Sequence, residues 1–70
     1  MLGTVKWFDS RLGYGFIKPD DQEKDVFVYY KNISASGYKK LEEAERVEFE
    51  IAESPRGPTA INVLVIGKKE

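Results

Sequence analysis

The sequence predicts an all-β fold, a small five-stranded antiparallel barrel formed by a single domain over residues 1–70. Three observations support this prediction. A chain of 70 residues has room for only one small domain. Five short segments carry strand patterns and are separated by turn-forming or polar residues. No strand alternates with a helical segment as in βαβ units, so the expected architecture is a closed or partly closed antiparallel barrel.

The first expected strand covers residues 4–8 and leaves the direction of one side chain open. Side chains alternate between the two faces of a strand. Strict alternation therefore places Trp7 on the core side together with Val5. A β-bulge or an edge bend would instead expose both Lys6 and Trp7. Periodicity alone allows either arrangement.

The second and third expected strands, residues 13–18 and 25–29, separate aliphatic from aromatic side chains. The polar link between them begins with Pro19, which fits the loop of a hairpin. One face of the pair carries the aliphatic residues Ile17, Val26 and Val28. The other face carries Tyr14, Phe16, Lys18, Asp25, Phe27 and Tyr29. Because the aliphatic side is the natural core side, pairing these strands would expose an aromatic patch.

The remaining segments complete the predicted barrel. Residues 46–52 alternate without a fault and place Val47, Phe49 and Ile51 inside. A turn at 54–58 and a β-branched strand at 59–66 follow. The connection at 31–45 is expected to be a loop with at most one turn of helix within 38–45, because a helix this short is marginal without packing.

The composition excludes several classes of function. The chain has no cysteine and no histidine, so it lacks disulfides, thiolate chemistry, the usual structural zinc sites and Ser-His-Asp or Cys-His catalysis. We expect no enzyme activity, no catalytic residue, no metal and no other cofactor. The longest aliphatic run, residues 63–66, is far shorter than the roughly 20 residues of a membrane span. With no signal-peptide pattern at its start, the chain is expected to be cytoplasmic and to have no membrane partner.

Charge and aromatic residues are unevenly distributed along a chain of net charge −1. Residues 1–18 contain three basic side chains and one acidic one, whereas residues 41–53 contain six glutamates and one arginine. Seven of the nine aromatic residues precede residue 31. An exposed aromatic face beside a few cations suits single-stranded nucleic acid, whose bases stack on rings while its phosphates meet lysine and arginine. Duplex DNA fits less well, because there is no recognition helix and no dense basic stripe.

Four segments resemble the motifs of bacterial cold shock proteins, and the similarity covers nearly the whole chain. They are Lys6-Trp7-Phe8, Gly13-Tyr14-Gly15-Phe16-Ile17, Asp25-Val26-Phe27-Val28-Tyr29-Tyr30 and Arg56-Gly57-Pro58. The resemblance implies a five-stranded OB-fold barrel that binds single-stranded DNA and RNA. It further implies a nucleic-acid chaperone that melts weak RNA structure and influences transcription and translation. We expect the protein to be a monomer. The implied nucleic-acid-binding residues are Lys6, Trp7, Tyr14, Phe16, Asp25, Phe27, Tyr29, Tyr30, Tyr38 and Arg56.

The chain departs from the family pattern at a few positions. Tyr29 stands where the family usually has histidine, so a ring is kept but imidazole protonation is lost. Leu12 stands where a lysine or arginine is common, and Lys31 adds a cation after the second motif. Ala44 stands where glycine is usual, in the turn before the fourth strand. None of these changes removes the expected stacking face.

A second function remains open from the residues alone. Aromatic side chains also mark protein interfaces, so the barrel could instead dock a peptide on its aromatic patch. The feature that favours nucleic acid is the set of cations around the rings, which a peptide groove does not generally need. These cations are Lys6, Lys18, Lys31 and Arg56.

Overall fold

Five β-strands make up most of the computed structural model, which describes residues 1–34 and 40–68. They are β1 (Leu2–Asp9), β2 (Tyr14–Pro19), β3 (Val26–Tyr29), β4 (Glu45–Ser54) and β5 (Gly57–Lys68). Neighbouring strands follow the order β1-β2-β3-β5-β4 and close into a barrel. The all-β barrel expected from the sequence is confirmed. Four of its strand pairs are antiparallel, while the short contact between β3 and β5 is parallel.

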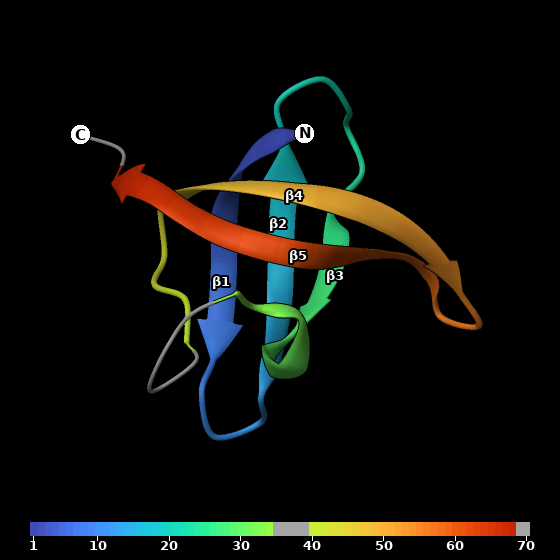
Figure 1. The fold of residues 1–70 in the computed structure, drawn as a ribbon, viewed down its shortest axis with the longest axis horizontal. Helices are drawn as coiled ribbons and strands as arrows, with labels where there is room; N and C mark the ends of the chain where they lie inside the picture. Colours follow the sequence, from blue (N-terminus) through green and yellow to red (C-terminus); the bar gives the residue numbers. More distant parts are fainter. Residues whose placement is uncertain (35–39, 69–70) are drawn as a thin grey trace.

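The core lies between two groups of strands. Figure 1 shows β1, β2 and β3 side by side, with the long β4–β5 hairpin running across them. The inward positions predicted from alternation are buried, with the exception of Ile51, which is partly buried at the edge of the core. Ile33 and Leu41, which belong to the connection between β3 and β4, are buried as well. The buried apolar residues are Val5, Ile17, Val26, Val28, Ile33, Leu41, Val47, Phe49, Ala60 and Val63.

A β-bulge in β1 settles the direction of Trp7. Val5 lies opposite Ile17 and Trp7 lies opposite Phe16, so Lys6 is an extra residue on the β1 side. Lys6 and Trp7 are both exposed, whereas Val5 is buried. The bulge inserts one residue and so returns Trp7 to the outer face. Of the two arrangements that periodicity allowed, the bulged one is present.

Two glycines allow β1 and β2 to come together closely. Gly13 has a φ of +84° in the turn between these strands, a conformation that glycine adopts at no steric cost, and its N–H donates to the Asp9 carbonyl at 2.8 Å. A Cβ atom built on Gly15 would lie 2.6 Å from the Cα of Phe8 and closer still to the Trp7 carbonyl oxygen. Gly15 therefore permits the close approach of the β1 and β2 backbones at this point.

The connection after β3 differs in detail from the expectation. A single 3-10 turn occupies Tyr30–Asn32, directly after β3. The described part of the segment in which at most one helical turn was expected, residues 40–45, is not helical, and the 3-10 turn at Tyr30–Asn32 was not predicted. Ile33 then pairs with Val63 of β5 through an isolated bridge, which anchors the connection to the barrel. Within the described ranges, no helix is long and apolar enough to cross a membrane.

Replacing Ala44 by glycine is expected to stabilise the protein. Ala44 has a φ of +73° in the turn before β4, and its N–H donates to the Val5 carbonyl at 2.9 Å. The left-handed conformation costs a non-glycine residue roughly 1–2 kcal/mol. Glycine removes this cost. Part of the resulting gain in stability is offset by the larger conformational entropy that glycine gives the unfolded chain, about 0.4–1 kcal/mol. We expect Ala44→Gly to raise the free energy of unfolding by up to about 1 kcal/mol in urea denaturation.

Ala52 provides a control for this substitution, because it lies in regular extended backbone within β4. Glycine at that position is expected to be destabilising. A loss of stability in Ala44→Gly equal to that in Ala52→Gly would contradict the assignment of strain to Ala44.

Candidate nucleic-acid interface

Four aromatic rings gather on the outer surface of β1, β2 and β3. The ring centroids of Trp7 and Phe16 lie 5.5 Å apart, and those of Trp7 and Tyr14 lie 5.9 Å apart. Phe27 continues the cluster at 5.5 Å from Tyr14 and 5.8 Å from Phe16. Each of these side chains is partly exposed. We call the set Trp7, Tyr14, Phe16 and Phe27 the aromatic face.

Strand register brings the rings of the aromatic face together. Trp7 lies opposite Phe16, and Phe16 lies opposite Phe27, so the three form a row across three strands. The aliphatic neighbours of these residues point into the barrel, because side chains alternate along each strand. Burial of Ile17, Val26 and Val28 therefore fixes the rings on the outside. This arrangement confirms the exposed patch expected from alternation.

Arg56 lies in the turn between β4 and β5, and its side chain contacts the ring of Phe27. Its guanidinium carbon lies 5.1 Å from the centre of the Phe27 ring, within cation–π distance. The turn is held by Ser54, whose hydroxyl donates to the Gly57 carbonyl at 2.8 Å and accepts from the Arg56 N–H at 3.2 Å. The Ser54 oxygen also lies 2.9 Å from the Thr59 hydroxyl. These bonds place a positive charge beside the aromatic face.

Tyr29 and Tyr30 extend the ring surface at the end of β3. Their ring centroids lie 4.8 Å apart, and both side chains are more than one third exposed. The Tyr30 N–H donates to the Gly13 carbonyl at 2.8 Å, which ties this end of β3 to the turn between β1 and β2. A hollow between β3 and the β4–β5 turn is lined by Tyr14, Phe27, Tyr29, Ser54, Pro55, Arg56 and Thr59. Of these, Ser54, Pro55 and Thr59 were not predicted. Their only signal in the sequence was the neighbouring Arg56.

Lys6 and Asp25, both predicted to contact nucleic acid, form an ion pair with each other. The Lys6 ammonium donates to Asp25 Oδ2 at 2.7 Å. The lysine side chain is more than half exposed, and the carboxylate is one quarter exposed. Lys31 is exposed on the 3-10 turn. Tyr38, the remaining predicted contact, lies outside the described residues.

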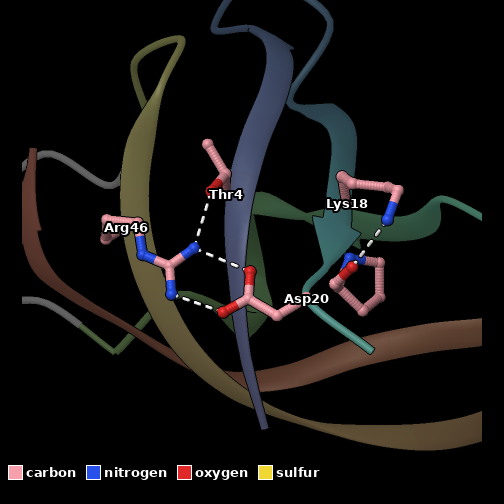
Figure 2. Close-up of polar contacts among 5 residues, drawn as sticks. Thr4, Lys18, Asp20 and Arg46 are labelled. Carbon is pink, nitrogen blue, oxygen red and sulfur yellow. Dashed lines mark hydrogen bonds and ion pairs between the residues drawn. The ribbon is translucent and has the colours of Figure 1, made fainter. Parts of the chain in front are cut away.

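Arg46 is bound in a separate polar cluster. Figure 2 shows its guanidinium between Thr4 and Asp20. It donates to the Thr4 hydroxyl at 2.8 Å and to the two Asp20 carboxylate oxygens at 2.7 and 2.5 Å. The hydrogen bond to Asp20 raises the pKa of Arg46 above its ordinary value. This cation therefore links β4 to β1 and to the residue after β2.

The geometry can bind a flat, negatively charged partner. The rings offer their exposed surfaces for stacking, and the cations at the edge can neutralise charge. Within the described part of the chain, no group of three or more acidic side chains is arranged to hold a metal ion.

Comparison with known proteins identifies the family. The model of the "Cold-shock" DNA-binding domain matches residues 1–66. The chain belongs to the cold-shock domain family. It is similar to the "Probable cold shock protein A" of Mycolicibacterium smegmatis, with 53% identity over 91% of this chain and 96% of that protein. It is also similar to the "Cold shock-like protein CspE" of Escherichia coli K12, with 50% identity over 91% of this chain and 93% of that protein.

The cold-shock domain accounts for the architecture found here. Its match covers all five strands, apart from the last residues of β5. The prediction of a nucleic-acid-binding cold shock protein is confirmed at the level of the family. Tyr29 and Leu12 are two of the positions at which a departure from the family pattern was noted from the sequence. Both side chains are exposed.

Proposed function

We propose that the protein binds single-stranded DNA and RNA on the aromatic face and acts as a nucleic-acid chaperone. The observation that carries the proposal is the row formed by Trp7, Phe16 and Phe27 across three strands, with Arg56 at its edge. Its cellular roles would be to keep weak RNA structure open and to influence transcription and translation. We also propose that it works as a cytoplasmic monomer and has no catalytic activity.

Stacking explains how such a surface would act on nucleic acid. Each base stacked on an aromatic ring contributes about 1–3 kcal/mol, and every base has a flat surface, so binding tolerates many sequences. The bases of a duplex already stack on one another and are not available to the rings. Binding therefore favours the unpaired strand and shifts weak hairpins toward the open form. Lys6 precedes Trp7 on β1, Lys31 follows Tyr30, and Arg56 lies against the Phe27 ring. These exposed cations would neutralise the phosphates of a strand whose bases stack on the rings.

Fluorescence of Trp7, the single tryptophan of the chain, tests this proposal directly. Titration with oligothymidine is expected to quench its emission, because a base would stack on the exposed indole. A matched titration with a duplex of the same length is the control and should give much weaker quenching. If oligothymidine fails to bind at every salt concentration tested, the proposal is contradicted, and the alternative of a docked peptide is favoured.

The salt dependence of binding is expected to be shallow. Binding that relies on stacking uses few phosphate contacts, and each contact to a single strand contributes about −0.7 to the slope of log affinity against log salt. Two or three cations would give a slope of roughly −1.5 to −2. Lys6→Gln should make the slope shallower by about 0.7. The measurement is the oligothymidine titration repeated from low to high salt, and a wild-type slope of about −5 or steeper would contradict a stacking-dominated site.

A further inference from the structure

Lys18 is placed by alternation on the same side of β2 as Tyr14 and Phe16. That position alone would make it one more cation for phosphates. Its contacts indicate a different role. The ammonium donates to the Pro19 carbonyl at 2.9 Å and to the Gln22 carbonyl. The side chain is half-buried. Two of its three N–H groups are therefore used by main-chain oxygens around the loop that joins β2 to β3.

This loop, residues 20–25, is also fixed at both of its ends. At the start, the Asp20 N–H donates to the Leu2 carbonyl at 3.0 Å, and the Asp20 carboxylate is held by Arg46. Figure 2 shows this anchor, with Lys18 turned toward the Pro19 carbonyl. At the other end, Asp25 is bound by Lys6. The bond from Lys18 to Gln22 fixes the middle of the loop.

The loop connects Lys18 to the edge of the aromatic face. Asp25 is the last residue before β3, so the path of the loop determines where its carboxylate lies. That carboxylate lies 2.7 Å from the ammonium of Lys6. Lys6 is the bulged residue of β1 and directly precedes Trp7. Asp25 thus holds the Lys6 charge next to the rings.

We propose that Lys18 is a positioning residue: by holding the carbonyls of Pro19 and Gln22 it sets the path of the β2–β3 loop, and through Asp25 it places the Lys6 ammonium for a phosphate. This inference rests on the proposed function. Lys18 itself makes no phosphate contact, because moving its ammonium to a phosphate would break both loop hydrogen bonds. Single-strand affinity depends on it only through the loop.

The first test compares Lys18→Met with wild type in oligothymidine titrations over a range of salt concentrations. Methionine keeps an unbranched apolar stem and removes only the charge and its donors. We expect affinity to fall about two- to tenfold, the cost of ordering a released side chain and loop. Lys18→Arg should restore part of the affinity, since a guanidinium also donates to carbonyls. In a Lys6→Gln background, where the Lys6 contact is already gone, the salt slope should stay unchanged on Lys18→Met. A slope made shallower there by about a further 0.7 would overturn the proposal, because Lys18 would then make a phosphate contact of its own.

The second test asks whether Lys18 acts through Asp25. In a double-mutant cycle, the loss caused by Lys18→Met should be much smaller in an Asp25→Asn background, because the link to Lys6 is already broken. An equal loss in both backgrounds would overturn the proposal. Lys31→Met is the matched control, since Lys31 is an exposed cation outside the loop and should show no coupling to Asp25.

A measurement without ligand separates this inference from the proposed function. In amide NMR spectra of the free protein, Lys18→Met should shift the resonances of Gln22, Asp25 and Lys6, whereas Lys31→Met should leave them in place. If wild type fails to bind oligothymidine, the proposed function falls, and the loop shifts alone decide whether Lys18 holds the loop. Unchanged resonances in Lys18→Met would overturn the positioning role in either case.

Discussion

Phe49→Ala is expected to lower the free energy of unfolding by about 3–5 kcal/mol, the cost of removing a fully buried ring. Phe49 is 1% exposed and is the largest of the fully buried side chains. A domain of 70 residues is stabilised by only about 4–10 kcal/mol in total, so this variant should lose a large share of its stability and unfold at a clearly lower temperature and urea concentration than wild type. Urea and thermal unfolding followed by circular dichroism would measure the change.

Glu48→Ala is the matched control for Phe49→Ala, because Glu48 is the preceding residue of β4 and is exposed. Surface substitutions of this kind change stability by about 0.5 kcal/mol or less. If both variants have the same free energy of unfolding as wild type, the Phe49 side chain does not stabilise the core. The packing described for the barrel would then be wrong.

Phe27→Ala is expected to weaken binding of oligothymidine by about 1–3 kcal/mol while the fold persists. We expect the upper part of this range, because Phe27 contacts Tyr14, Phe16 and the guanidinium of Arg56, so its loss removes the centre of the ring surface. Phe16→Ala should act in the same direction. The measurement is a titration followed by Trp7 emission at one salt concentration, with a thermal melt of each variant.

The control for Phe27→Ala is Leu64→Ala. Leu64 is an exposed apolar residue on β5, at 47% exposure, and belongs to no part of the aromatic face. Its removal should leave oligothymidine binding unchanged. If Phe27→Ala unfolds the chain and Phe49→Ala does not, the inner and outer faces of the barrel have been assigned in reverse.

Local patterns were sufficient to predict the strands and the sides to which their residues point. Alternation placed Val26 and Phe27 on opposite faces, and the structure agrees. It could not decide the direction of Trp7, because a single inserted residue reverses the alternation beyond it. The burial of Ile33 and Leu41 was not predicted either. Neither residue lies in a strand, so their burial depends on how the connection folds back over the barrel.

The sequence predicted which residues form the candidate site better than it predicted the contacts among them. The rings on β1, β2 and β3 come together as expected, since strand pairing fixes their distances. The pairing of Lys6 with Asp25 and the bonds from Lys18 to the loop were not predicted. Both depend on the path of residues 20–25, which no periodic pattern specifies. The contacts of the site residues with nucleic acid remain predictions.

The strand pairs that close the barrel differ in the number of residues they pair. β4 and β5 pair along most of their length, whereas β3 and β5 meet over only two residue pairs, Phe27 with Thr59 and Val28 with Ala60. Segments with few hydrogen bonds open at lower free energy than well-paired ones. Phe27 and Arg56 both line the hollow beside this narrow seam, so we expect opening of the seam to widen that hollow. Because purines and pyrimidines differ in size, we expect a site with separable walls to accept both kinds of base at little cost in strain if the proposed function holds.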